Sequence, residues 1–188
     1  MEFIRINTQD SYYFKKMMAI YEISFPIFEQ RTLNNQIEVL QEQDYYCTAV
    51  CEEAKLVGII WYWNLDEMKY IEHLAISPDL RGKGYGSKIL KSFCEDNEKV
   101  MLEIDPPNDD ISIRRLKFYS NLGFKLQDFQ HTHPPYRKGY KGHSLKIMSL
   151  KTQLAEEEYE KFNAFLIERI MVYSEYGNER AKSLSINV

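Results

Sequence analysis

The sequence lacks the features that mark membrane proteins, secreted proteins and nucleic-acid binders. No apolar run approaches the roughly 18 residues of a membrane-spanning helix, so no membrane partner is predicted. The first residues, MEFIRINTQD, do not combine a basic start with an apolar core, so we expect no signal peptide and a cytoplasmic protein. The formal net charge of −4 disfavours nucleic acid as a partner, because nucleic-acid binders usually carry a basic face.

Cysteine is also scarce, with only Cys47, Cys51 and Cys94. This odd set, spread over an apparent strand and an apparent helix, is typical of reduced, buried thiols. A zinc site needs more closely grouped ligands, so no metal is predicted. There is no internal repeat or low-complexity segment, and 188 residues that are 44% hydrophobic and 28% charged indicate one ordered domain with a sizeable core.

The spacing of apolar residues predicts an alternation of strands and helices. The predicted strands are 2–6, 45–51, 56–63, 69–77, 100–104, 124–129 and 144–150, and the predicted helices are 10–25, 33–40, 87–97 and 109–122. Short connections predict that the strands between 45 and 77 form an antiparallel meander, and the helix before 100–104 predicts that this strand runs parallel to 69–77. The fold class predicted is α/β (α+β), a mixed, mostly antiparallel sheet of about seven strands with helices on both faces.

A further helix is predicted over residues 152 to about 176, which contain no Pro or Gly. At 1.5 Å per residue it would be roughly 36 Å long. The apolar residues that follow helical spacing are Tyr159, Phe162, Leu166, Ile170 and Tyr173. Others lie on different sides, so the helix needs more than one surface to bury it, either its own domain or a homodimer partner. We therefore expect a domain of residues 1–151 and a C-terminal helical extension with a polar tail, 152–188.

The most informative stretch is residues 70–93, YIEHLAISPDLRGKGYGSKILKSF, where a strand, a basic glycine-rich turn and a helix follow one another. Glycine permits backbone angles that aim several amides at one anion, and the helix N-terminus adds its positive end. Arg81 and Lys83 add formal charge. The P-loop spacing G-x-x-x-x-G-K-[ST] is absent, and the dinucleotide fingerprint G-x-G-x-x-G would need glycine at Ser87. The turn therefore predicts a phosphate site of another type.

What fits this turn is the pattern [Q/R]-x-x-G-x-[G/A], and a later helix ends in FYSNLGF, residues 118–124. With both motifs in this order, residues 1–151 resemble the GNAT superfamily of N-acetyltransferases, whereas the C-terminal helix does not. The resemblance implies acetyl-CoA as co-substrate, with its pyrophosphate on the turn and its pantetheine arm along the preceding strand. The residues implied are Leu74, Ala75 and Ile76 for pantetheine, and Arg81, Gly82, Lys83, Gly84, Tyr85, Gly86 and Ser87 for pyrophosphate.

The resemblance also implies catalytic residues. Tyr119 matches the family tyrosine that protonates the leaving thiolate. Glu72 is the predicted base that takes the proton of the amine, and its alternative role is to position the loop. Simple alternation places Tyr70, Glu72 and Leu74 on one face of the strand and His73 on the other. His73 is predicted to be a structural histidine, and its alternative role is that of a base.

Two positions depart from the family pattern. Ser112 stands where Asn is frequent, and it is still predicted to hydrogen-bond coenzyme A. Arg115 stands where a small Ala is usual, so it either reaches a phosphate or indicates that this helix packs differently. These departures leave a second function open, a non-catalytic module that binds coenzyme A or an acyl-CoA for regulation or protein interaction.

Acceptor contacts are expected from the loop 24–31, which either covers a cleft or packs on the core, from the end of strand 100–104 and from the loop 130–142. The candidates are Glu29, Glu103 and Asp105, which would pair with a cationic amine, and Tyr136, which would wall the cleft; the alternative for each is an ordinary solvated loop. The sequence therefore predicts direct transfer of an acetyl group to a primary amine of a small molecule or a protein.

Overall fold

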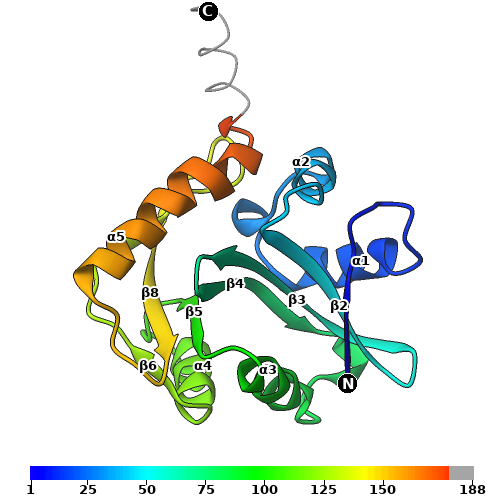
Figure 1. Cartoon of the computed structure of the whole chain (residues 1–188), viewed down its shortest axis with the longest axis horizontal. Coiled ribbons are helices and arrows are strands. Elements are labelled where there is room, and N and C mark those ends of the chain that lie inside the picture. The colour runs from blue at the N-terminus through cyan, green and yellow to red at the C-terminus, as the bar shows by residue number, and fades with distance from the viewer. Residues whose placement is uncertain (178–188) are drawn as a thin grey trace, which may run out of the picture.

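In the computed structural model, which describes residues 1–177, the chain forms a mixed sheet with helices on both faces (Figure 1). The strands are β1 (Glu2–Arg5), β2 (Tyr45–Glu52), β3 (Lys55–Leu65), β4 (Met68–Ile76), β5 (Lys99–Ile104), β6 (Phe124–Leu126), β7 (His131–His133) and β8 (His143–Leu150). The helices are α1 (Phe14–Ser24), α2 (Leu33–Val39), α3 (Tyr85–Glu95), α4 (Asp110–Ser120) and α5 (Glu156–Phe165). Short 3-10 turns cover Ile27–Glu29 (η1) and Pro78–Leu80 (η2).

The sheet has the order β1-β2-β3-β4-β5-β8-β6, and β7 pairs separately with β8. Strands β2 to β4 form the predicted antiparallel meander, and β1 pairs antiparallel with β2 at its edge. Strand β5 is parallel to β4, because α3 carries the chain back to the starting edge. The predicted fold class is confirmed, with β7 as an additional short strand.

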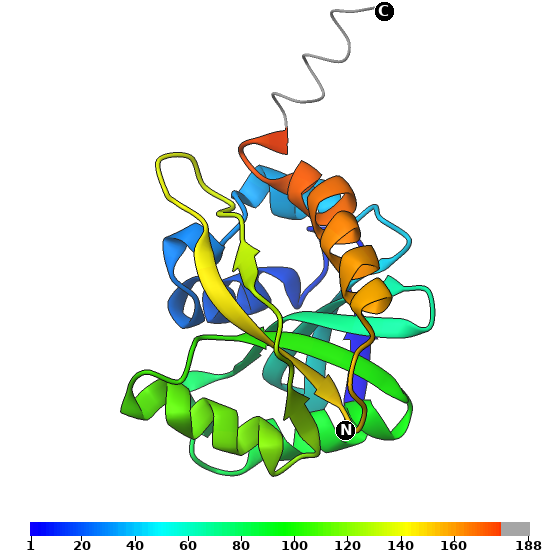
Figure 2. The same ribbon diagram turned by 90° about the vertical axis from the view of Figure 1, so that its left-hand side faces the viewer.

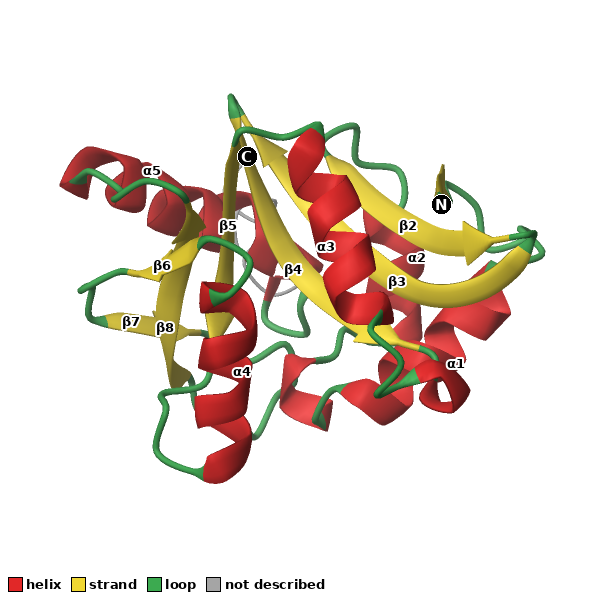
Figure 3. Cartoon of the chain, turned by 90° about the horizontal axis from the view of Figure 1, so that it is seen from below, coloured by secondary structure: helices red, strands yellow, loops and turns green. Residues whose placement is uncertain are grey.

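Two layers of apolar residues lie on opposite faces of the sheet. One contains Met17 of α1, Trp61 of β3 and Phe162 of α5. The other contains Ile60 of β3 together with Ile89 and Phe93 of α3. Figure 3 shows α3 and α4 covering this second face, so the glycine-rich turn and FYSNLGF lie on the same side of the sheet.

The region after α4 differs from the prediction. Strand β6 ends at Leu126 rather than residue 129, because the buried Gln127 leaves the strand: its side-chain amide donates to Ser149 Oγ (2.8 Å), and its side-chain oxygen accepts from the Leu154 amide (3.0 Å). Strand β7 forms inside the predicted loop 130–142 by pairing with the start of β8, and the two lie side by side in Figure 2. These long-range contacts leave no local signal in the sequence.

The C-terminal helix is also shorter than predicted. The α-helix α5 covers Glu156–Phe165 and continues as a π-helical segment, Leu166–Ile170 (η3), and a 3-10 turn, Met171–Tyr173 (η4). Phe162, Leu166 and Ile170 are fully buried against the chain's own domain. The apolar stripe is therefore buried by packing on the chain's own domain, which is one of the two predicted alternatives. The predicted tail beyond residue 177 lies outside the described residues.

No helix within residues 1–177 combines the length and the apolar character needed to cross a bilayer.

Candidate active site

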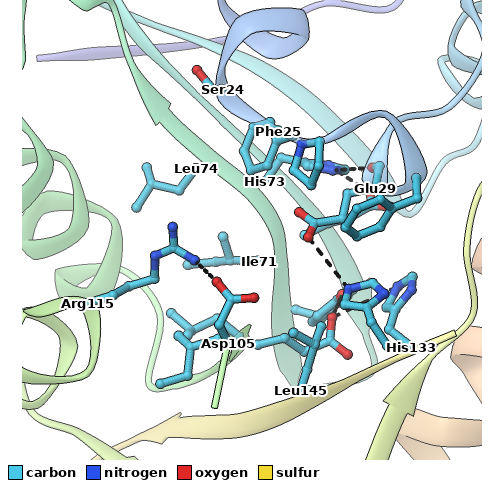
Figure 4. Close-up of a pocket in the computed structure, with 18 of the residues that line it drawn as sticks. Ser24, Phe25, Glu29, Ile71, His73, Leu74, Asp105, Arg115, His133 and Leu145 are labelled. Atoms are coloured by element: carbon cyan, nitrogen blue, oxygen red, sulfur yellow. Dashed lines mark hydrogen bonds and ion pairs between the residues drawn. The ribbon is translucent and has the colours of Figure 1, made fainter. Parts of the chain in front are cut away.

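Strands β4 and β5 pair only over their first halves and then separate. Their parallel ladder runs from Met68 and Lys99 to Ile71 and Leu102, although β4 continues to Ile76 and β5 to Ile104 (Figure 3). A pocket of about 290 Å³ opens at the point of separation, and residues of β4, β5, α4, β7, β8 and the loop after α1 line it (Figure 4). The gap leaves one edge of β4 unpaired beside the pocket.

The glycine-rich turn lies at the end of β4, next to this open edge. Gly82 (φ +73°) and Gly84 (φ +81°) adopt left-handed backbone angles, and a Cβ at either would meet no atom within 4 Å. Glycine is therefore required for conformation, while the space around the turn stays open. Gly84 is the N-cap of α3, and its carbonyl accepts the Lys88 amide at 3.1 Å. The amides that precede Lys88 belong to the helix N-terminus, which favours anions.

The side chains of this turn hold it in place. Arg81 donates from Nε to the Ile76 carbonyl (3.1 Å) and from Nη2 to Ser24 Oγ (2.9 Å), so it joins the end of β4 to the end of α1. Lys83 donates to the Asp79 carbonyl at 2.8 Å. Tyr85 turns its hydroxyl towards β2 and donates to Glu52 Oε2 at 3.0 Å.

Tyr119 of α4 lines the pocket, as the resemblance requires. Its ring packs against Phe118 (centroids 5.0 Å apart) and Phe124 (5.8 Å). Burial raises the pKa of Tyr119 to about 12, with Arg115 opposing. The phenol is therefore protonated at neutral pH and able to donate.

The two departures from the family pattern take different positions. Ser112 is 3% exposed and lies in the capping box of α4, where its hydroxyl lies 3.1 Å from both the backbone carbonyl and the carboxylate of Asp109. It does not line the pocket. Arg115 does line the pocket and forms an ion pair with Asp105 across the end of β5 (Figure 4). A role of Ser112 in coenzyme A binding remains a prediction, since its hydroxyl is already used by the helix cap.

Glu72 lies at a β-bulge that the sequence analysis did not anticipate. The register of β3 and β4 shifts there, so that Glu72 has no partner on β3. The extra residue turns the following side chain over. Tyr70 and His73 therefore lie on the α1/α5 face, whereas Leu74 packs on the α3 face. Tyr70 and Glu72 share a face as predicted, but the placement of Leu74 with them was wrong, as was the placement of His73 opposite Glu72.

The Glu72 carboxylate is buried in a polar cluster. It is 2% exposed, and Oε1 lies 2.7 Å from Arg31 Nη2. Trp63 Nε1 donates to Oε2 at 3.0 Å, and the Tyr136 hydroxyl donates to Oε1. Burial alone would raise the pKa of Glu72, but the Arg31 charge and the bonds from Arg31 and Tyr136 outweigh it and lower the pKa to about 2. Such a carboxylate is a weak proton acceptor at neutral pH.

His73 is a structural histidine in this arrangement. It is 4% exposed, and its ring packs edge-on against Tyr21 and Phe25. Nε2 lies 3.2 Å from the Glu29 carbonyl. Burial lowers the pKa of His73 to about 4, so the ring is neutral at pH 7.

The four predicted acceptor residues, Glu29, Glu103, Asp105 and Tyr136, all line the same pocket. Tyr136 is 2% exposed and its amide bonds the Phe28 carbonyl at 2.9 Å, so it is a fixed wall rather than part of a solvated loop. Asp105 is half-exposed. The loop that carries Glu29 folds as η1 against the pocket and so covers it in part.

Glu103 joins the pocket to α5. The Tyr70 hydroxyl donates to its carboxylate at 2.5 Å, His131 Nε2 contacts the other oxygen, and the Tyr159 hydroxyl lies 3.1 Å from His131 Nδ1. Burial alone would raise the pKa of Glu103, but the nearby His133 and the bond from His131 outweigh it and lower the pKa. Helix α5 therefore supports the pocket from behind.

Sequence reasoning missed Arg31, His133 and His143. Arg31 belongs to no motif, and only the folded chain brings it to Glu72. His133 and His143 line the pocket because β7 and β8 pair at these two residues. The spacing His131-Thr132-His133 is the signal that could have indicated a strand with both rings on one side. Within the described part of the chain, no three His, Cys, Asp or Glu side chains are grouped to hold a metal ion.

Comparison with known proteins agrees with this architecture. The family model described as Acetyltransferase (GNAT) family matches residues 14–124, more than half of the chain. The chain therefore belongs to the GNAT acetyltransferase family.

Individual relatives are likewise described as acetyltransferases. A GNAT-family structure from Bacteroides thetaiotaomicron, titled an acetyltransferase without a stated substrate, is 30% identical and superposes with a TM-score of 0.82 over 89% of this chain and 97% of its own. YjbC of Bacillus subtilis, provisionally described as an acetyltransferase, is 30% identical over 104 residues, 54% of this chain and 52% of the relative. The chain thus matches about half the length of that curated relative.

More distant structures share the fold alone. The ribosomal-protein-S18-alanine N-acetyltransferase of Escherichia coli is 15% identical, with a TM-score of 0.57 over 83% of this chain and 96% of its own. An aminoglycoside 6'-N-acetyltransferase solved with coenzyme A is 12% identical, with a TM-score of 0.53 over 79% of this chain and 96% of its own.

Proposed function

We propose that this protein is an N-acetyltransferase that moves the acetyl group of acetyl-CoA directly to a primary amine. The observation that carries the proposal is the pocket at the separation of β4 and β5, with Tyr119 in its wall and the glycine-rich turn at the end of β4. Membership of the GNAT family and a relative of the same fold solved with coenzyme A support acetyl-CoA as the co-substrate.

In this proposal the co-substrate lies along the open edge of β4. The amides from Arg81 to Ser87 and the N-terminus of α3 bind its pyrophosphate. The pantetheine arm runs beside the unpaired edge from Leu74 to Ile76, like an added strand. The acetyl group then reaches the pocket, where a backbone N–H near Ile76 polarises its carbonyl.

Tyr119 acts as the proton donor to the leaving thiolate. Its raised pKa keeps it protonated at neutral pH, and the residue lines the pocket. No cysteine nucleophile is needed for direct transfer. The cysteines also suit that role poorly, because burial raises the pKa of Cys47 and of Cys94, the latter to about 11.

Glu72 serves in this proposal as a positioning residue rather than the base. Its carboxylate binds Arg31 and Tyr136, which come from the two loops that close the acceptor side. Glu103 and Asp105 give the pocket an acidic character that favours a cationic amine. Both a small-molecule amine and an amine of a protein fit this description.

The specific alternative is a non-catalytic module that binds coenzyme A or an acyl-CoA for regulation. It is favoured by one observation, the Arg115–Asp105 pair that lines the pocket where the family usually has a small residue. This alternative predicts binding without turnover.

The test is to incubate the protein with acetyl-CoA and a broad panel of primary amines, including peptides with free N-termini, and to follow free thiol and the acetylated product. Amine-dependent thiol release with matching product supports the enzyme. Binding of acetyl-CoA without turnover on any amine leaves the regulatory module as the better account.

A further inference from the structure

Transfer to an amine requires that a proton leave the nitrogen before it attacks, because a primary amine is mostly an ammonium ion at neutral pH. The proton acceptor must lie in the same pocket as the thioester. The pocket offers four carboxylates, which are Glu29, Glu72, Glu103 and Asp105.

Three of these carboxylates already have close partners. Glu72 pairs with Arg31 at 2.7 Å. Glu103 accepts from Tyr70 at 2.5 Å and contacts His131. Asp105 pairs with Arg115. A proton taken up by any of them would disrupt an existing bond or ion pair, which disfavours the transfer.

Glu29 differs from these three. Within residues 1–177 its carboxylate accepts no hydrogen bond, and its one ion-pair contact is with His143 Nε2 at 3.6 Å. Its side chain is 27% exposed and points into the pocket towards the Arg115–Asp105 pair (Figure 4).

The backbone of Glu29 is nevertheless fixed. Its carbonyl accepts from the Tyr21 hydroxyl (3.3 Å) and lies 3.2 Å from His73 Nε2, and its amide bonds the Pro26 carbonyl at 2.9 Å. A carboxylate on a rigid turn, free of strong partners and facing the pocket, has the geometry of a base.

We propose that Glu29 is the catalytic base that takes the proton of the acceptor amine. This inference rests on the proposed function and deepens it. One N–H bond of the ammonium breaks and its proton goes to the Glu29 carboxylate, which later releases it to water. The nitrogen lone pair forms the C–N bond to the acetyl carbon while the C–S bond breaks. The thiolate takes the proton of Tyr119, and the second proton lost by the nitrogen restores Tyr119.

The surroundings of Glu29 suit this role. Burial raises its pKa to about 7, nearby Asp105 and Glu103 add to the increase, and Arg115 opposes it. The titratable and charged groups that line the pocket around Glu29 are Tyr70, Glu72 and His73 of β4, Glu103 and Asp105 at the end of β5, Arg115 and Tyr119 of α4, His133 of β7, Tyr136 of the loop after β7, and His143 of β8. A base with a pKa near the working pH combines a useful ionised fraction with good proton affinity.

The test compares Glu29→Gln and Glu29→Asp with wild type, using acetyl-CoA and the most active amine of the panel over a range of pH. We expect Glu29→Gln to lower kcat by about 100-fold and to leave the affinity for acetyl-CoA unchanged. The increase of kcat with pH near neutrality, which reports the ionisation of the base, should disappear in this variant. Glu29→Asp should recover part of kcat. The control is Glu22→Gln, an exposed carboxylate of α1 that should match wild type.

A second arm needs no acceptor. Carbon-13 NMR of protein labelled at the glutamate carboxyl should show one carboxyl that titrates near pH 7 and disappears in Glu29→Gln. The assignment to Glu29 would be overturned by a Glu29→Gln variant that keeps the wild-type kcat and its pH dependence, or that changes KM alone. It would also be overturned if no glutamate carboxyl titrated near pH 7 in the NMR experiment. Wild type that binds acetyl-CoA but acetylates no amine would instead overturn the proposed function, and this inference with it.

Discussion

Tyr119 is the side chain that the proposed chemistry uses directly on the leaving group. Replacing Tyr119 by Phe keeps the ring contacts with Phe118 and Phe124 and removes only the hydroxyl. We expect kcat to fall by about two orders of magnitude because the thiolate loses its proton donor, while the Kd for acetyl-CoA stays unchanged.

Steady-state kinetics and calorimetry measure these two quantities. The matched control is Tyr12→Phe, since Tyr12 is 71% exposed and does not line the pocket. A Tyr119→Phe enzyme with the wild-type kcat would remove Tyr119 from the mechanism.

The buried ion pair between Glu72 and Arg31 leads to a prediction about stability rather than about proton transfer. Glu72→Gln leaves the fully buried Arg31 without a counter-ion, so we expect the free energy of unfolding to fall by about 3–5 kcal/mol. Urea denaturation measures this loss. Glu157→Gln, which breaks an exposed pair with Lys161, should leave the free energy of unfolding close to that of wild type.

The same carboxylate predicts how stability depends on pH. Its pKa is lowered in the folded state from 4.5 to about 2, so its contribution is complete above about pH 4.5 and is lost as the pH falls towards about 2. The wild-type free energy of unfolding should therefore fall more steeply than that of Glu72→Gln in this window. Parallel pH curves for the two proteins would contradict the ion-pair account.

The site residues whose positions were predicted correctly from the sequence are those that belong to recognisable motifs. Tyr119 and the glycine-rich turn lie where the motifs predict, because each motif is local and depends on one turn or one helix end. Arg31 was missed, since its role arises from contact with Glu72 across 41 positions of chain. The roles predicted for Glu72 and Ser112 stay predictions whose surroundings favour other tasks.

Among the elements, the β-bulge at Glu72 had the largest consequence for the site. Period-2 alternation describes a regular strand, and one extra residue reverses it from that point onward. The predicted meander, the parallel β4–β5 pair and the capped α4 are correct because connection length and capping residues act locally. Strand β7 and the early end of β6 depend on pairing with β8, which no local pattern reports.

Helix α5 leads to a prediction about the element as a whole. Phe162 is fully buried, and its ring lies 4.8 Å from that of Tyr70, which in turn bonds Glu103 in the pocket. Phe162→Ala should lower the free energy of unfolding by about 3–5 kcal/mol because it leaves a cavity between α5 and the sheet.

Chemical denaturation tests this prediction, with Val172→Ala as the control because Val172 is 40% exposed. A loss below about 1 kcal/mol for Phe162→Ala would show that α5 does not hold the pocket wall. The homodimer through this helix stays a prediction. The main argument for it was that the apolar stripe needs a surface to bury it, and the chain's own domain already supplies that surface.

At the scale of the whole molecule, the two faces of the sheet have separate tasks in this account. The α3/α4 face carries the glycine-rich turn and Tyr119, which act on the co-substrate, whereas the loops, β7 and β8 form the acceptor side, which α5 supports from behind. The two sides meet at the gap between β4 and β5. This division predicts that acetyl-CoA binds without an amine present.

The most direct test of the central claim is a calorimetric titration of the protein with acetyl-CoA. We predict saturable binding at one site in wild type and strong weakening in Gly84→Ala, because alanine is strained at φ +81° and its methyl group would enter the open space where the proposal puts the pyrophosphate. Gly139→Ala places the same methyl at a similar positive φ, +84°, outside the turn and should bind as wild type does. No binding by a folded wild-type protein, or equal binding by the two variants, would contradict the account.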